Sequence, residues 1–311
     1  MMEAKIREYT KSKYVIISTA KDEENYIEDT IESVVNQTIR PATWVIVDDG
    51  SQDRTPEVVS KYCEEYNWIK LVRIERGPQR QPGSAVINAF NQGCKLIKDE
   101  DFEFIVKLDC DLRFDPYYFE QLFLKFHQDE RLGIASGIYL ENRGKAWIPV
   151  KMPDYHVAGA CKAVREKCFK EIGGFISSRG WDTVDEIKAQ MMGWRTSHFT
   201  DLQMYHLKNE GSGTGQLRTN AMLGEIFYLT GGSKLFFVLK VLHRLIVGKP
   251  FIGGGLLMAF GYLKPMIQRK KLLVSHEEAI FYRNLLNKRI FLTIFNLVLL
   301  RNLFPSREGS K

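Results

Sequence analysis

The sequence lacks the cysteine patterns that stabilise small extracellular folds. Its five cysteines, at positions 63, 94, 110, 161 and 168, are odd in number and form no Cys-x-x-Cys pair. This spacing argues against a disulfide framework and against a zinc site. An apolar leader is also missing before the first predicted strand, so nothing there indicates a secretory signal. We therefore expect a reduced protein that faces the cytoplasm.

Long apolar runs are missing near the end of the chain. The runs there, such as Pro250–Leu263 with 14 residues and Ile290–Leu300 with 11, are shorter than the roughly 20 residues of a spanning helix. Residues 212–311 also contain no aspartate. Their fifteen Lys or Arg and four Glu give a net charge of +11, which leaves −5 for residues 1–211 within the total of +6. Basic residues between apolar runs favour an anionic membrane surface over nucleic acid as the partner.

The composition changes at Lys208–Gly215, where Gly, Ser and Thr mark a loop. We predict an α/β domain at residues 1–215 and a basic, apolar, mainly helical membrane-associating region at residues 216–311. The region is expected at the cytoplasmic face of a membrane, as a peripheral or monotopic attachment. The sequence is compatible both with helices that lie on the surface and with a re-entrant hairpin.

Glycines are missing from the acidic loop Thr19–Asn25, which follows the first predicted strand. This disfavours a dinucleotide oxidoreductase, whose phosphate-binding turn needs them. Short apolar strands nevertheless alternate with helical segments, which predicts mostly parallel strands joined by crossover helices. The predicted strands are 14–17, 44–47, 70–74, 104–108, 133–140 and 158–164, and the predicted helices are 24–36, 56–66, 84–97, 119–129 and 183–192.

Two carboxylates directly follow one of these strands. Asp109 and Asp111 come after the apolar run 105–108 and are separated by Cys110. Because side chains alternate along an extended chain, both acids point the same way and Cys110 packs on the other side. Open α/β sheets bind ligands at the carboxyl ends of their strands, so this pair suits a divalent cation that carries a phosphate.

A second group of acids follows another strand. The run Trp44–Val47 ends in Asp48 and Asp49, before residues that are typical of turns and helix caps. Ser51 or Asp53 is expected to cap the helix that begins near Pro56. Capping does not account for the whole cluster, so a binding role for Asp48 and Asp49 is also predicted.

Four motifs together resemble those of the family 2 glycosyltransferases, which use nucleotide sugars and have the GT-A fold. The motifs are Ser18–Asn25, Val47–Ser51, Asp109–Asp111 and Trp181–Asp182. Their order and spacing match that family from about Tyr14 to Gly215. The resemblance implies a Rossmann-like, mixed but mostly parallel sheet flanked by helices, and a metal-dependent hexosyl- or related transferase.

The resemblance also assigns binding residues, for a donor such as a UDP- or GDP-sugar. The nucleotide-sugar set is Thr19, Glu23, Asp48, Asp49, Arg76 and Asp109, and the ligands of Mn²⁺ or Mg²⁺ are Asp111, Asp109 and His206. Simpler explanations stay open for three of them. Glu23 complements a helix dipole, Arg76 lies in a solvated basic loop, and His206 is a packed or surface histidine.

The resemblance further implies a catalytic base near the start of a later helix. Asp182 stands where the family carries the Asp of a Glu-Asp pair, and Trp181 replaces the Glu, which puts that neighbour's acceptor contact in doubt. Asp185 and Glu186 are the alternatives. Asp182 can also be explained as the cap of its helix. One residue could serve both purposes.

We interpret the chain as an inverting glycosyltransferase whose acceptor is a hydroxyl of a lipid-linked or membrane-proximal glycan. In-line attack after deprotonation by Asp182 needs no covalent intermediate. One alternative is a polyprenyl-phosphate sugar transferase of the same fold, whose anionic acceptor has less need of a base. Another is a catalytically inactive sugar- or nucleotide-binding homologue, against which the retained acids argue.

Overall fold

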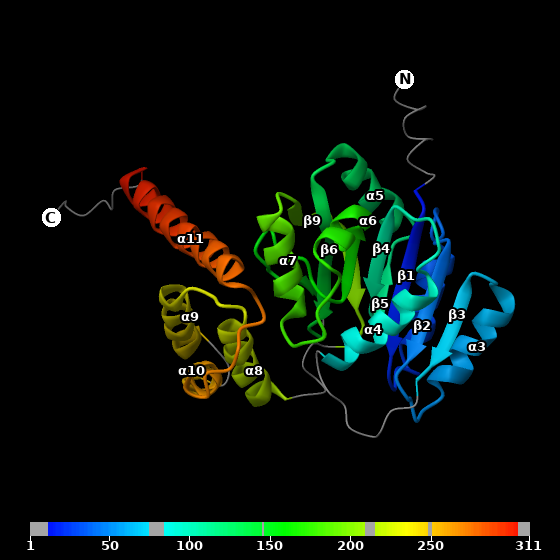
Figure 1. Ribbon diagram of the computed structural model, residues 1–311, viewed down its shortest axis with the longest axis horizontal. Helices are drawn as coiled ribbons and strands as arrows, with labels where there is room; N and C mark the ends of the chain where they lie inside the picture. The colour runs from blue at the N-terminus through cyan, green and yellow to red at the C-terminus, as the bar shows by residue number, and fades with distance from the viewer. Residues whose placement is uncertain (1–11, 75–83, 145, 209–214, 248–250, 304–311) are drawn as a thin grey trace. The chain divides into compact units, whose positions relative to one another are not determined.

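The computed structural model describes residues 12–74, 84–144, 146–208, 215–247 and 251–303 (Figure 1). The chain divides into two compact units, Met1–Ser212 and Gly213–Lys311.

The first unit is built on one mixed sheet. Within the described residues the sheet has nine strands, in the order β3-β2-β1-β4-β8-β6-β9-β5, with β7 paired to β6. Their bounds are β1 (Tyr14–Ala20), β2 (Thr43–Asp48), β3 (Ile69–Arg73), β4 (Phe104–Leu108), β5 (Leu112–Phe114), β6 (Leu132–Asn142), β7 (Trp147–Pro149), β8 (Cys161–Arg165) and β9 (Arg195–His206). Strands β1 to β4 are mutually parallel where they pair, β8 runs antiparallel to β4 and β6, and β9 is parallel to β6.

Helices cover both faces of this sheet. They are α2 (Ile27–Val35), α3 (Thr55–Glu65), α4 (Ser84–Leu96), α5 (Tyr118–Gln128), α6 (Glu166–Glu171) and α7 (Trp181–Met191) (Figure 1). Alternate residues of β1 enter different cores, so Ile16 packs with residues of α2, α3 and α5, while Ile17 packs with residues of α4, α6 and α7. Helix α4 approaches the sheet closely at Gly93, where an added Cβ would lie 2.6 Å from Ile17 Cγ2.

The short and polar strands were not predicted from the sequence. Strands β5 and β7 have three residues each, and β9 carries many exposed polar side chains. Strand β9 forms because it pairs with β6 along most of its own length, rather than because of an apolar pattern in its sequence. The register of this pairing shifts between Gly137 and Ile138. An added Cβ at Gly137 would lie 2.2 Å from the Leu202 carbonyl oxygen, which explains the glycine at this irregularity.

The second unit is helical in its described part. It contains α8 (Gln216–Leu229), α9 (Lys234–Val247), α10 (Gly253–Ile267) and α11 (His276–Leu303). Helices α8 and α10 pack backbone to backbone, because an added Cβ at Gly224 would lie 2.0 Å from Met258 O, and one at Gly261 would lie 1.9 Å from Ala221 O. Among the residues described, none of these helices combines the length and the apolar character needed to cross a membrane.

Candidate active site

The carboxyl end of β4 carries a buried lysine as well as the predicted acids. Lys107 is only 3% exposed, and its ammonium group donates to the Asp109 carboxylate and, at 2.6 Å, to the Gly159 carbonyl oxygen. Burial raises the pKa of Asp109; the Lys107 charge opposes that rise, and the Asp111 carboxylate adds to it. Asp109 is therefore held and partly neutralised by Lys107, a residue of the strand that it follows.

Asp111 meets His206 at the same edge of the sheet. Strand β5 begins directly after Asp111 and pairs with the end of β9, where Leu112 lies opposite His206. This pairing brings Asp111 Oδ2 to 3.3 Å from His206 Nε2. The Leu207 amide also donates to the Asp111 carbonyl oxygen at 2.8 Å. An antiparallel pair thus joins two residues that are distant in the sequence.

The chemistry of this edge fits a hard divalent cation. Asp111 Oδ1 is buried, and it has no hydrogen-bond partner among the residues that the structure describes. Carboxylate and imidazole groups are ligands that Mn²⁺ accepts, and Mg²⁺ is commonly held by one or two carboxylates together with substrate phosphates. No three His, Cys, Asp or Glu side chains in the described part of the chain are grouped closely enough to hold an ion by themselves.

The predicted residues after β2 differ in their surroundings. Asp48 is fully buried; its Oδ1 accepts from the Ser51 amide at 3.0 Å, and its Oδ2 lies 3.1 Å from Arg73 Nε. Asp48 therefore stabilises the turn at the end of β2. Asp49 is 8% exposed and follows it, and Lys21 donates to its carbonyl oxygen at 3.1 Å.

Hydrogen bonds join the acidic loop after β1 to the segment that follows β2. The Glu23 amide donates to Thr55 Oγ1 at 2.8 Å, and the Asp22 amide donates to Ser51 Oγ at 3.0 Å. The Glu23 carboxylate pairs with Lys208 Nζ at 2.8 and 3.0 Å. Thr19 is half-buried near the end of β1. The predicted Arg76 lies outside the described residues.

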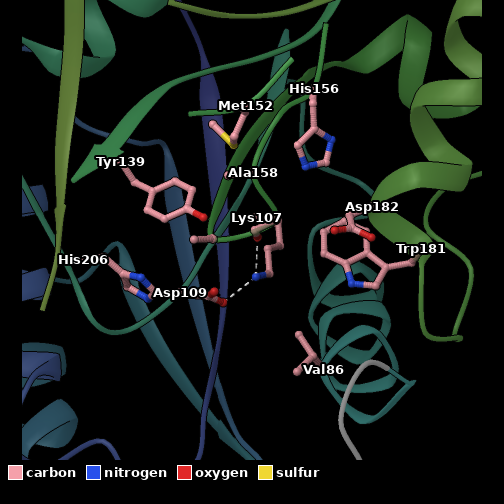
Figure 2. Close-up of a pocket in the computed structure, with 12 residues that line it drawn as sticks. Val86, Lys107, Asp109, Tyr139, Met152, His156, Ala158, Trp181, Asp182 and His206 are labelled. Carbon is pink, nitrogen blue, oxygen red and sulfur yellow. Dashed lines mark hydrogen bonds and ion pairs between the residues drawn. The ribbon is translucent and has the colours of Figure 1, made fainter. Parts of the chain in front are cut away.

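A cavity of about 310 Å³ opens beside these strand ends. Its lining consists of Val86, Lys107, Asp109, Tyr139, Met152, His156, Ala158, Gly159, Ala160, Trp181, Asp182 and His206. Figure 2 shows His206 and Tyr139 on one side, His156, Trp181 and Asp182 on the other, and Lys107 with Asp109 between them. The cavity thus brings the predicted base to the same space as two of the three predicted metal ligands.

Trp181 forms the wall between two buried cations. Its ring centroid lies 5.6 Å from Lys107 Nζ and 5.1 Å from Lys162 Nζ. Such distances are typical of cation–π contacts. Gly159 leaves the room for the indole, since an added Cβ there would lie 3.1 Å from Trp181 Cζ2.

Asp182 lies in the first turn of α7 but is not its cap. The N-cap is Gly180, with φ of 82°, and no side chain caps this helix end. Because capping does not occupy Asp182, its carboxylate is available at the cavity wall.

The alternative bases, Asp185 and Glu186, are buried and do not line the cavity. Asp185 is 2% exposed, and its carboxylate accepts from Lys162 Nζ at 2.8 and 3.1 Å. Burial raises the pKa of Asp185 to about 7, although the Lys162 charge opposes the rise. Glu186 is 3% exposed and contacts His156 Nδ1 at 3.1 Å. Neither acid lines the cavity, so the structure separates them from Asp182.

Sequence reasoning missed several polar residues of this region: Lys107, Tyr139, His156, Lys162 and Lys208. The two buried lysines had a detectable signal, because each stands within an apolar strand. Lysine is almost never fully buried unless it is paired. The other three residues carried no local signal, since only the fold brings them to the site.

Comparison with known proteins identifies the family. The sequence model of glycosyl transferase family 2 matches residues 15–180 of the chain. A poly-β-1,6-N-acetyl-D-glucosamine synthase of Staphylococcus aureus (strain MSSA476) is 33% identical over 119 residues, which are 37% of this chain and 26% of that protein. A putative glycosyltransferase of Bacillus subtilis (strain 168), EpsH, is 31% identical over 99 residues, or 32% of this chain and 26% of that one. The matches thus span about a quarter of these relatives.

Solved structures show the same GT-A fold. A mannosyltransferase from Pyrobaculum calidifontis, PcManGT in complex with GDP-Man and Mn²⁺, aligns with a TM-score of 0.53 at 16% identity and covers 94% of this chain and 87% of its own. Residues 1–349 of Staphylococcus aureus TarS, in complex with UDP-GlcNAc, align with a TM-score of 0.53 at 17% identity, over 87% and 78% of the two chains. At these identities the likeness shows the fold alone.

Proposed function

The chain belongs to glycosyl transferase family 2, and from this premise we propose that it transfers a sugar from a nucleotide-diphosphate donor to an acceptor hydroxyl, with inversion. One observation carries the proposal: Asp109 and His206 share a cavity with Asp182. A donor bound at the strand ends and an acceptor bound at α7 would then meet in one cavity. Bringing two reactants together in this way is a large part of catalysis.

We assign the donor to the edge formed by the ends of β1, β2 and β4. Thr19, Glu23 and Asp49 would contact the nucleotide, and Asp109 the ribose or the sugar. Asp48 is also assigned to the nucleotide: its Oδ1 accepts from the Ser51 amide, whereas its buried Oδ2, 3.1 Å from Arg73 Nε, has no hydrogen-bond partner among the described residues. PcManGT and TarS were solved with GDP-Man and UDP-GlcNAc, so a GDP- or UDP-sugar is the proposed donor.

Asp111 and His206, with Asp109 beside them, would hold Mn²⁺ or Mg²⁺. The buried Asp111 Oδ1 without a hydrogen-bond partner in the described structure supports this assignment. When bound, the ion would neutralise the negative charge that develops on the leaving nucleoside diphosphate. The Mn²⁺ in the PcManGT complex agrees with this proposal.

Asp182 would act as the general base. Its carboxylate accepts the proton of the acceptor hydroxyl as that oxygen bonds to the anomeric carbon. The bond from this carbon to the diphosphate oxygen breaks on the opposite side, so the configuration inverts. A phosphate acceptor would not need this base, and the position of Asp182 in the cavity therefore favours a hydroxyl acceptor.

The second unit would attach the enzyme to an anionic membrane surface, close to a lipid-linked or membrane-proximal glycan. Helix α9 exposes a set of large apolar side chains: Leu235, Val238, Leu239, Leu242 and Ile246. Three cations lie close together beside these side chains: Lys240, Arg244 and Arg289. Desolvation and the charges of the two arginines lower the pKa of Lys240, which is partly exposed. Apolar burial combined with basic residues is the physical basis of interfacial binding.

The test is a donor screen with the full chain. Calorimetry would measure the affinity for UDP-GlcNAc and GDP-mannose with and without Mn²⁺, and product analysis would follow donor hydrolysis and transfer to a β-1,6-linked N-acetylglucosamine oligosaccharide. Metal-dependent binding of one donor, followed by transfer or hydrolysis, is expected. A well-folded protein that binds no nucleotide sugar under any of these conditions would refute the proposed function.

A further inference from the structure

His156 reaches the cavity from the segment between β7 and β8, on the side of Asp182 (Figure 2). One of its two ring nitrogens is bound by the protein, because Nδ1 lies 3.1 Å from Glu186 Oε2. In the described structure no hydrogen-bond partner of Nε2 is found. The ring therefore has one nitrogen fixed by a carboxylate and one that is free to bind a molecule in the cavity.

The surroundings of Glu186 fix which ring nitrogen carries the proton. Glu186 Oε1 accepts from the Val157 amide at 2.7 Å and lies 3.4 Å from Lys162 Nζ. With donors on Oε1, the carboxylate accepts at Oε2 as well, so the His156 Nδ1–H donates to it. Nε2 is then an acceptor when the ring is neutral and a donor when the ring is charged.

The carboxylates around His156 stabilise the protonated form of its ring. Burial alone would lower the pKa of His156, but the hydrogen bond and the charge of Glu186 outweigh it and raise the pKa. Asp182 raises the pKa further, while Lys162 opposes it. The neighbouring His198 Nδ1 contacts the His156 carbonyl oxygen at 2.9 Å. Elsewhere in the cavity lining, Lys107 and Asp109 are paired with each other, and His206 contacts Asp111.

We propose that His156 binds the acceptor, and that its Nε2–H donates to an oxygen of a neutral sugar whose neighbouring hydroxyl loses its proton to Asp182. This deepens the proposed function and rests on it. The acceptor side of the cavity has no excess of positive charge, since Glu186 balances His156 and Asp182 adds a negative charge. An anionic phosphate acceptor would be repelled there, whereas a neutral hydroxyl is hydrogen-bonded on both sides.

The test measures transfer from UDP-GlcNAc to a β-1,6-linked N-acetylglucosamine oligosaccharide across pH. We expect His156→Ala to raise the acceptor KM about tenfold to a hundredfold, the range for one lost hydrogen bond to a charged group, and to leave the donor affinity unchanged. In the unmodified protein the acceptor KM should rise as the pH passes upward through the raised pKa of His156, because the donating proton is lost. A general loss of structure would not produce this pH dependence.

Two further variants separate binding from folding. Glu186→Gln removes the charge that raises the pKa of His156, so the rise of the acceptor KM should move to lower pH. His156→Gln retains an amide donor that does not titrate, so it should restore part of the affinity without pH dependence. His127→Gln, on α5 and outside the cavity lining, is the matched control and should behave as the unmodified protein.

Histidine NMR of the full chain gives a readout that does not need turnover. The oligosaccharide should shift the His156 ring resonance and raise its pKa, whereas a short-chain prenyl phosphate should not. If the protein binds UDP-GlcNAc but the oligosaccharide leaves His156 unchanged, or if the prenyl phosphate binds there instead, the inference is wrong and the proposed function stands. If no nucleotide sugar binds, the proposed function itself has failed.

Discussion

Lys162 Nζ lies 2.8 Å from Asp185 Oδ2, and both side chains are almost completely buried. Lys162 also donates to the Asp182 carbonyl oxygen at 3.0 Å, so the pair is joined to the first turn of α7. Several carboxylates raise the pKa of Lys162 against the effect of its burial. This buried pair therefore fixes the backbone that carries the proposed base, although neither partner lines the cavity.

Breaking the pair from one side should destabilise the fold. Lys162→Met would leave the Asp185 carboxylate buried without its cation, which typically costs about 3–5 kcal/mol. The double variant Lys162→Met with Asp185→Asn removes both charges and should recover most of that loss. Urea unfolding of the three proteins measures the difference. If the single and double variants had equal free energies of unfolding, the unpaired Asp185 charge would not be the cause of the loss, and the prediction would be wrong.

The stability should also depend on pH through Asp185. Its pKa rises from 3.8 to about 7 on folding, so between these values the folded state binds more protons than the unfolded state. Asp185 therefore favours folding less as the pH rises from about 4 to about 7. The stability of the unmodified protein relative to Asp185→Asn should fall over this interval in urea unfolding. A constant difference would contradict the raised pKa.

Asp111→Asn should weaken the Mn²⁺-dependent part of nucleotide binding and reduce turnover strongly. The reason is that it removes one of the two carboxylates at the strand edge while Lys107 continues to hold Asp109. Calorimetry of the nucleoside diphosphate, with and without Mn²⁺, separates the metal-dependent affinity from the rest.

Asp115→Asn, at an exposed position on the loop after β5, removes the same charge from the surface and serves as the matched control. If Asp111→Asn kept the full metal-dependent affinity and rate, the metal assignment would be wrong.

Asp182→Asn should lower the transfer rate by about 10²-fold or more, because a general base typically contributes 10²–10⁴-fold. Donor affinity should remain close to normal, since the donor is assigned to the other wall of the cavity. Asp185→Asn should lower the rate less, because Asp185 faces Lys162 rather than the cavity. Rapid-quench transfer assays rank the two variants, and the reverse order would identify Asp185 as the base.

Membrane attachment should depend on the exposed apolar side chains of α9. Leu242 is 49% exposed and Ile246 is 72% exposed, so Asp at both positions should leave the fold intact and reduce flotation with anionic liposomes. Flotation of the unmodified chain should weaken in high salt, since basic residues contribute about 1 kcal/mol each near the surface.

Leu96→Asp is the matched control, because Leu96 is 49% exposed in the first unit and should not affect flotation. Equal flotation of all three proteins, or of none, would contradict the assignment of this surface. Extraction by detergent alone, and not by salt or carbonate, would instead indicate a membrane-inserted hairpin in the second unit.

The sequence by itself determined the family, the alternation of strands and helices, and the acids at the strand ends. These features are local. An apolar strand followed by Asp109 and Asp111 places both acids at one edge of a parallel sheet in any fold of this type. Helix α7 was likewise recognisable from its periodicity, and the resemblance of Trp181–Asp182 to the family motif identified Asp182 as the proposed base.

Only the tertiary structure decided how these acids differ from one another. Asp182 reaches the cavity and Asp185 does not, because burial and Lys162 hold Asp185 behind the wall. His156 and His206 join the site through the packing of α7 and the pairing of β5 with β9. Contacts between residues far apart in the chain leave no local pattern, and the charge and availability of each carboxylate depend on such contacts.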